Sequence, residues 1–209
     1  MSFYAVAQGK QCGIFNSWNE CQENVKGFKG AKFKKFSNEN DAKQFIQENQ
    51  LTSTVIEPKE PEYYVYMDGA CSKNGSIDAK ASIGIYFGEN DPRNISKKIE
   101  DKQTNNVAEL NAMIFAFTIV KSDLEKGKTI TFVSDSEYTI KCANSYGKVQ
   151  HLSNWTKDIP NKDLVKTLYE SCSSFPNLQF LHVKAHTNKE DKHSLGNKQA
   201  DLLARQPIY

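Results

Sequence analysis

At Thr104 the hydrophobic period of the chain changes from two residues to three or four, and this change determines the class of fold. Before it, three short segments predict strands joined in a meander: Tyr63–Ala70, which begins with five apolar or aromatic residues, and Lys80–Phe87 and Ile95–Asp101. After it, apolar residues at spacings of three and four predict a long amphipathic helix: Val107, Leu110, Ile114, Phe117 and Val120.

Beyond this helix, strands and helices alternate. "TITFVSD" (129–135) and "LQFLHVKAH" (178–186) predict strands, whereas "SEYTIKCAN" (136–144), Asp163–Ser173 and Leu195–Arg205 predict helices. A meander followed by alternating helices and strands implies a mixed sheet with helices on its faces. We therefore expect an α/β (α+β mixed-sheet) fold with five strands in residues 63–209.

Residues 1–49 predict a separate small domain. "FYAVAQGKQCGIF" (3–15) alternates through a turn and favours a hairpin. Ser17 and Glu20 form the pattern of a capping box before a short helix, "AKFKKF" favours a third strand, and "SNENDAKQFIQEN" favours a second helix capped by Ser37 or Asn38. Residues 50–62, with two prolines and three glutamates, are typical of a linker.

Composition limits the possible partners. With 38% hydrophobic residues the chain can form a core, and its net charge of +2 means that a nucleic acid would have to be held by a local basic patch. Five widely spaced cysteines predict reduced thiols and an intracellular protein of the cytoplasm or nucleus. No apolar run approaches the roughly 20 residues of a membrane span, and the strand pattern beginning at Phe3 leaves no room for a targeting segment. We expect no membrane partner.

Two predicted strands lead to aspartates. "YYVYMDGACSKNG" (63–75) predicts a buried strand that ends at Asp68 and breaks at Gly69, and Asp135 ends "TITFVSD". In open sheets of this class, ligands bind beyond the carboxyl ends of strands, where the strand order reverses. If these two strands are parallel neighbours, both carboxylates emerge there, within reach of Glu109 and Asp201 from the first and last helices.

Each carboxylate also has an ordinary structural explanation: a turn with Gly69 for Asp68, a helix cap for Asp135, a favourable helix-dipole position for Glu109, and an ion pair with Arg205 for Asp201. Four carboxylates in one crevice, however, would repel strongly unless cations shared the site. Oxygen ligands favour Mg²⁺ or Mn²⁺ over Zn²⁺. Two such ions about 3.5–4 Å apart are suited to phosphodiester cleavage.

Seven stretches carry a resemblance to a known family. In the larger domain they are "YMDGACSKNG", "QTNNVAEL", "FVSDS", "HVKAHT" and "GNKQADLLAR", and in the front domain "FYAVAQGKQCGIFNSWNEC" and "AKFKKF". With these motifs, Tyr63–Arg205 resembles ribonuclease H of type 1, and Phe3–Ile46 resembles the hybrid-binding domain that precedes it in cellular enzymes. The resemblance implies an endonuclease that cuts the RNA strand of RNA–DNA hybrids with little sequence preference and leaves 3′-hydroxyl and 5′-phosphate ends.

The resemblance also implies roles for individual residues. Asp68, Glu109, Asp135 and Asp201 match the ligands of two Mg²⁺ ions, for which Mn²⁺ can substitute, and His186 matches a histidine that assists proton transfer or product release. Contacts with the RNA strand are implied for Asn74, Asn105, Asn106 and Cys71; contacts with the DNA strand for Thr104, Asn161, Lys102, Tyr138 and Tyr146. The implied partner is an RNA–DNA hybrid bound by a monomer without a small-molecule cofactor.

In the front domain the resemblance implies that the hybrid contacts Tyr4, Trp18, Phe33, Lys34 and Lys35. Aromatic rings would pack on deoxyribose and lysines would hold phosphates, which would help repeated cutting. The alternatives are core packing for Trp18 and Phe33 and a solvated face for the lysines. For the asparagines nearer the cut, the alternative is an ordinary turn or helix start.

The chain departs from the family in two places. The loop "TNKEDKHSLGN" (187–197) is longer than usual and carries His193, which leaves open whether His186 or His193 assists catalysis. Residues 147–160 are less basic than in many members, so the grip on substrate would depend more on the front domain. Two other functions stay open: a hybrid-binding protein on an inactive nuclease fold, and a different nuclease or strand-transfer enzyme with the same fold.

Overall fold

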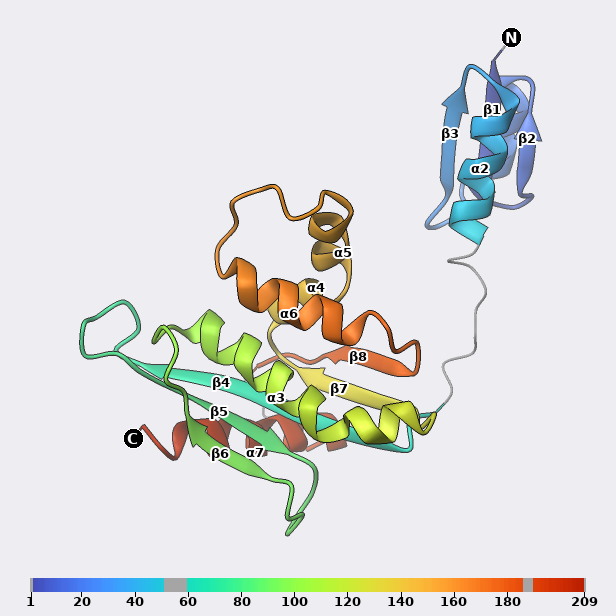
Figure 1. The fold of residues 1–209 in the computed structure, drawn as a ribbon. Coiled ribbons are helices and arrows are strands. Elements are labelled where there is room, and N and C mark those ends of the chain that lie inside the picture. Colours follow the sequence, from blue (N-terminus) through green and yellow to red (C-terminus); the bar gives the residue numbers. More distant parts are fainter. Residues whose placement is uncertain (1, 51–59, 186–189, 209) are drawn as a thin grey trace. The chain divides into compact units, whose positions relative to one another are not determined.

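The computed structural model describes residues 2–50, 60–185 and 190–208, and the chain divides into two compact units, 1–59 and 60–209 (Figure 1). Most of the predicted linker, 50–62, lies outside the described residues. Its two ends belong to the units, because Gln50 is the last residue of a helix and the Glu62 N–H donates to the Thr129 carbonyl at 2.8 Å.

The first unit is a three-stranded antiparallel sheet in the order β2-β1-β3 with two helices, as expected. Its elements are β1 (Phe3–Gln8), β2 (Gly13–Phe15), α1 (Trp18–Val25), β3 (Lys32–Phe36) and α2 (Glu39–Gln50). The capping box of Ser17 and Glu20 is present, and of the two candidate caps for α2 it is Asn38 whose side chain accepts the Asp41 N–H at 2.8 Å. The core is small, with buried side chains at Ala5, Val6, Ala7, Cys21 and Ala42.

The second unit is a mixed five-stranded sheet in the order β6-β5-β4-β7-β8. The strands are β4 (Tyr63–Ser72), β5 (Lys80–Tyr86), β6 (Ile95–Lys98), β7 (Ile130–Ser134) and β8 (Leu178–His182). As predicted, β4, β5 and β6 form an antiparallel meander and β7 lies parallel to β4. The helices are α3 (Asn105–Glu125), α4 (Glu137–Ala143), α5 (Ser145–Leu152), α6 (Lys162–Cys172) and α7 (Lys192–Arg205).

Helices cover both faces of this sheet. The larger core lies on the face covered by α3 and α6, where Phe132, Met67 and Leu110 are fully buried, and α7 packs on the opposite face against Tyr66 and Val133 (Figure 1). Among the described helices, none is long and apolar enough to cross a bilayer.

Strand β4 corrects one expectation. It does not break at Gly69 but continues to Ser72, because β5 pairs with it as far as Ser72, whereas pairing with β7 stops at Tyr66. Asp68 therefore lies inside a strand that has lost one neighbour. Gly69 serves close packing and not a turn, since a Cβ on it would lie 2.2 Å from the Glu109 backbone nitrogen.

Several element boundaries also differ from the prediction. Helix α7 begins three residues earlier, because the Asp191 carboxylate caps it by accepting the N–H groups of His193 and Ser194, each at 3.1 Å. Strand β8 ends at His182, where its partner β7 ends, and β6 ends at Lys98. Helix α5, which was not predicted, begins after Asn144, whose side chain accepts the Ser145 N–H.

Helix α7 is fixed closely against β5 and β6. A Cβ on Gly84 would lie 2.1 Å from the Ala200 carbonyl oxygen, so only glycine permits this approach. The Ser82 hydroxyl donates to the Ala204 carbonyl, and the Ser96 hydroxyl donates to the Leu203 carbonyl at 2.7 Å. The C-terminal turn of α7 is thereby held in place on the sheet.

Candidate active site

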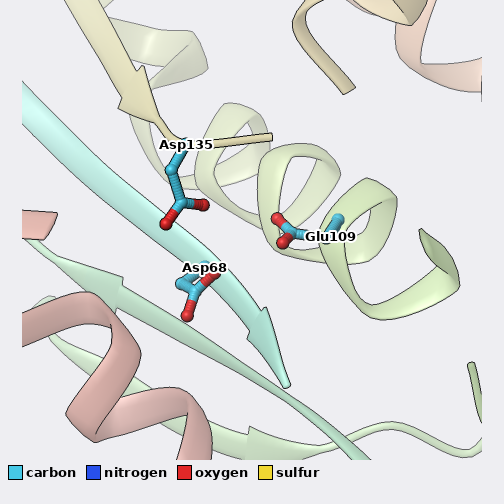
Figure 2. A group of neighbouring side chains, drawn as sticks. All are labelled: Asp68, Glu109 and Asp135. Atoms are coloured by element: carbon cyan, nitrogen blue, oxygen red, sulfur yellow. The ribbon is translucent and has the colours of Figure 1, made fainter. Parts of the chain in front are cut away.

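Three carboxylates from separate elements meet beside the sheet. Asp68 on β4, Glu109 on α3 and Asp135 directly after β7 each offer an oxygen, and these oxygens all lie within 4.8 Å of one another (Figure 2). Asp68 and Glu109 are each only 6% exposed. The parallel pairing of β4 and β7 brings the two aspartates together, and the absent side chain of Gly69 lets α3 bring Glu109 to them.

Asp201 lies at the rim of this cluster. A pocket of about 360 Å³ is lined by all three clustered carboxylates and also by Asp201 and Arg205 from α7. Asp201 Oδ1 lies 2.9 Å from Arg205 Nε, so the ion pair that was the ordinary explanation for this residue does form. Asp201 nevertheless adds its negative charge to the site, because that charge helps to raise the pKa of Asp68.

Burial and mutual repulsion make the cluster costly to ionise. Burial, followed by the charges of Asp135 and Asp201, raises the pKa of Asp68 to about 8. Burial and then the charges of Asp68 and Asp135 hold the pKa of Glu109 well above its usual range. Glu109 Oε2 is also buried, without a hydrogen-bond partner among the described residues. A buried acceptor without a donor and an all-oxygen ligand set fit a hard divalent cation such as Mg²⁺ or Mn²⁺.

Two residues not anticipated from the sequence hold Asp135. The buried Asn197 donates from Nδ2 to Asp135 Oδ2 at 3.0 Å. His182 Nε2 lies 3.1 Å from the Asp135 carbonyl oxygen, which can only accept, so this nitrogen is the donor. Asp135 itself does not cap α4, because Ser136 does so through the Thr139 N–H. The signals for Asn197 in the sequence are its place in the stretch "GNKQADLLAR" and its position four residues before Asp201, on the same face of a helix.

Three of the residues expected to face an RNA strand lie at this pocket or next to it. Cys71 and Asn105 line it, and the Asn74 side chain accepts the Asn105 N–H at 3.3 Å. The Cys71 thiol lies 3.5 Å from the Gln103 carbonyl oxygen. Asn106, the next residue of α3, is exposed.

The residues expected to face a DNA strand lie at the starts of helices. Thr104 caps α3, accepting the Val107 N–H at 3.4 Å, and Lys102 before it is exposed. Asn161 precedes α6 in a left-handed conformation with φ 55°. Burial raises the pKa of Tyr138 to about 12. Tyr138 and Tyr146 are partly buried and pack against the core.

The two candidate histidines are placed differently. His186 lies outside the described residues, but Ala185 immediately before it lines the pocket. The His193 ring packs edge-on against Tyr64 with 4.7 Å between centroids, and its Nδ1 lies 3.3 Å from the Tyr66 hydroxyl. His193 is thus engaged by tyrosines of β4 and is absent from the described pocket lining.

The front unit carries an exposed aromatic surface formed by Tyr4, Trp18 and Phe33. Trp18 lies 5.9 Å from Tyr4 and 5.8 Å from Phe33 between ring centroids, and Trp18 and Phe33 are 43% and 42% exposed. Core packing is therefore wrong as an explanation for both. The Lys35 ammonium lies 5.6 Å from the Tyr4 ring on this surface, whereas the Lys34 ammonium lies over Phe36, on the opposite face of β3.

The segment 147–160 offers little basic surface. Trp155 is buried and its ring lies 6.3 Å from Tyr169 and 6.5 Å from His151 between centroids. Lys148 and Lys157 are the exposed cations of this segment.

Comparison with known proteins gives matches along nearly the whole chain. A family model described as RNase H matches residues 60–209, and one described as Ribonuclease H1 N-terminal domain matches residues 2–46. Ribonuclease H1 of Rattus norvegicus is 27% identical, with 98% of this chain and 88% of the relative aligned. Ribonuclease H of Saccharomyces cerevisiae is 31% identical over 98% of this chain and 68% of the relative.

A solved structure with the same fold is the PFV RNase H domain. Its TM-score with this chain is 0.56 at 24% identity, over 69% of this chain and 93% of that domain. At this level of identity the likeness establishes the fold of the larger unit.

Proposed function

Because the chain belongs to the ribonuclease H family, we infer that it is a ribonuclease H that hydrolyses the RNA strand of RNA–DNA hybrids and binds the hybrid with its N-terminal domain. The single observation of the structure that carries this conclusion is the cluster of Asp68, Glu109 and Asp135, with oxygens within 4.8 Å of one another in a pocket open to solvent. All three residues lie within the range that the RNase H family model matches, which supports this conclusion.

The proposed ligands of two Mg²⁺ ions, replaceable by Mn²⁺, are Asp68, Glu109, Asp135 and Asp201. Bound there, such ions would activate the attacking water and stabilise the leaving oxygen, which gives 3′-hydroxyl and 5′-phosphate ends. The chain itself holds the carboxylates in place: β4 and β7 fix the two aspartates, α3 brings Glu109, and Arg205 holds Asp201 at the rim. His186 would assist proton transfer or product release, supported by Ala185 lining the pocket.

The protein would select a hybrid because one group of residues contacts an RNA strand and another group contacts a DNA strand. Asn74, Asn105 and Asn106 offer amides that both donate to and accept from a 2′-hydroxyl, and Cys71 lies beside them. The deoxyribose strand would lie along Thr104, Asn161, Lys102, Tyr138 and Tyr146. Contacts to sugars and phosphates carry no base information, so little sequence preference should follow.

The aromatic surface of the front unit would form a second binding site for the hybrid. Tyr4, Trp18 and Phe33 are placed to pack on deoxyribose, and Lys35 beside them is placed to hold a phosphate. Lys34 would reach a phosphate only around the edge strand β3. Tethering this binder to the catalytic unit would raise the local concentration of substrate and favour repeated cutting.

We further propose that the protein acts as a monomer in a reducing compartment, either the cytoplasm or the nucleus. One chain supplies all the carboxylates of the pocket, and all five cysteines are free thiols. Light scattering coupled to size-exclusion chromatography checks the first statement, and localisation of a tagged protein checks the second.

A cleavage assay tests the function. End-labelled RNA–DNA hybrid, duplex RNA and duplex DNA of one sequence are incubated with the protein and Mg²⁺, with chelator as the blank. We expect cuts only in the RNA of the hybrid, only with the metal, and none with Asp68→Asn. A protein that shifts the hybrid but leaves it intact would be a binding module, and one that cuts duplex DNA would be a different nuclease of this fold.

A further inference from the structure

Helix α7 presents a polar stripe to the acidic pocket. Asn197, Asp201 and Arg205 are spaced four residues apart and so lie on one face of the helix. Asp201 and Arg205 line the pocket, and Asn197 contacts Asp135. The stripe therefore runs along the side of the cluster opposite to α3, and Asn197 is the member of the stripe that donates a hydrogen bond to one of the three clustered carboxylates.

Asn197 is in an unfavourable place for an amide. The residue is 5% exposed, and its Oδ1 is buried without a hydrogen-bond partner in the ranges that the structure describes. An amide in such a place loses hydrogen bonds that it would make in water. Packing alone would be served at least as well by an apolar side chain of similar volume. What the amide adds is a hydrogen bond, which its Nδ2 donates to Asp135 Oδ2 at 3.0 Å.

That bond sets how the Asp135 carboxylate is turned. Asp135 follows the last residue of β7, and its main-chain carbonyl is held separately by His182. The hydrogen bond from Asn197 to Oδ2 restricts rotation of the carboxylate and leaves Oδ1 for another partner. A neutral donor is suited to this task, because a lysine or arginine would repel a divalent cation and an acidic residue would add to the existing repulsion.

We propose that Asn197 is a positioning residue of the metal site, which acts through Asp135 by holding its carboxylate in the orientation that a divalent ion requires. This inference rests on the proposed function. Hydrogen-bond partners of metal ligands typically matter by roughly 10–100-fold in metal affinity, and the loss of this one should fall in that range.

The test uses the full chain without nucleic acid. Asn197→Leu keeps the branched shape and the number of heavy atoms of the side chain and removes the donor, whereas Asn197→Ala removes both the donor and most of the side chain. Gln199→Leu and Gln199→Ala make the same changes at an exposed position of the same helix. Binding of Mn²⁺ is measured by calorimetry, and unfolding is followed by circular dichroism without metal, so that folding and metal affinity are separated.

We expect Asn197→Leu to fold with a metal-free melting temperature at or above that of the wild type and to bind Mn²⁺ roughly 10–100-fold more weakly. Both Gln199 variants should bind as the wild type does. If Asn197→Ala does not fold, the leucine variant decides the question. Equal Mn²⁺ affinity of wild type and Asn197→Leu would overturn the role of Asn197 and leave the proposed function intact. Absence of binding to the wild type would instead remove the metal site itself, and this inference with it.

Discussion

At the scale of single residues, Asp68 shows the main energetic feature of the site: a carboxylate that is both buried and close to other negative charges. It is buried inside a strand, yet it faces two further carboxylates, and its pKa is raised to about 8 by burial and by the charges of Asp135 and Asp201. Near neutral pH the metal-free protein must either keep a proton there or tolerate the repulsion. A bound divalent cation would remove both costs.

This conflict predicts how stability varies with pH. The unfolded Asp68 releases its proton near pH 4, whereas the folded one keeps it until about pH 8, so the folded state binds more protons in between. The stabilisation is complete below pH 4 and is lost as pH rises towards 8. We expect the free energy of unfolding in chelator to fall by roughly 1 kcal/mol per pH unit over this range. Denaturant melts of wild type and Asp68→Asn check it, since the variant should lose the part of the slope that Asp68 contributes and keep the part that comes from Glu109; equal slopes would contradict the prediction.

Asp135→Asn should change activity and stability in opposite directions. It should abolish cleavage and yet stabilise the metal-free protein by about 1 kcal/mol, because one of the charges that raise the pKa values of Asp68 and Glu109 is gone. Melting temperatures in chelator measure the effect, with Asp158→Asn at an exposed position as the matched control. A variant that melts at or below the wild-type temperature would count against crowding of the carboxylates.

The sequence identified the carboxylates but not what surrounds them. Asp68 and Asp135 could be placed because each follows a hydrophobic strand pattern, and parallel pairing then brings them together. Asn197 could not be foreseen, because its importance comes from one hydrogen bond across the sequence to Asp135 and from its burial. Likewise, the exposure of Trp18 depends on how α1 lies on β1 and β2 and on how the Trp18 ring meets Phe33 of β3, which no local pattern records.

At the scale of elements, the ends of the strands depend on where the neighbouring strands pair with them more than on the local sequence. Strand β4 runs past Gly69 because β5 continues to pair with it, whereas β8 stops at His182 because β7 has ended. The order and type of the strands followed from hydrophobic period. The short helix α5 was missed because its capping residue, Asn144, also reads as the end of α4.

Glycine at position 69 is required by the approach of α3 to β4. In Gly69→Ala the added Cβ would meet the Ala108 and Glu109 backbone, which cannot move without displacing α3. We expect a loss of roughly 1–3 kcal/mol in the free energy of unfolding, together with weaker Mn²⁺ binding, because Glu109 moves with the helix. Gly13→Ala, where the new Cβ would lie 3.8 Å from the Phe15 ring, is the control. Wild-type stability and metal binding in Gly69→Ala would show that the contact can relax.

At the scale of the whole molecule, the two units differ in the kind of site that each carries. The larger unit holds the acidic pocket, and the smaller one presents an aromatic surface with a lysine beside it. With a net charge of only +2, the chain has no strong overall field to attract nucleic acid. Local contacts must therefore supply the binding, and the aromatic surface of the front unit is the part of them that can be tested separately.

Trp18→Ala tests whether the aromatic surface of the front unit binds the hybrid. We expect hybrid binding to weaken by roughly 1–3 kcal/mol, the range for loss of one stacking side chain, while the front unit stays folded. Phe28→Ala, at an aromatic residue of the same unit that is 37% exposed, should bind as the wild type does. Affinity is measured with an uncleaved hybrid in chelator, and folding by circular dichroism. Unchanged affinity in Trp18→Ala would exclude the aromatic surface from binding.

The joint placement of the carboxylates and the cations is best tested by anomalous scattering from crystals soaked with Mn²⁺. The expected result is a strong anomalous peak bounded by the carboxyl groups of Asp68, Glu109 and Asp135, with Asp201 turned towards it. Crystals that diffract well, contain Mn²⁺ in the soak and show no anomalous peak among these carboxylates would contradict it.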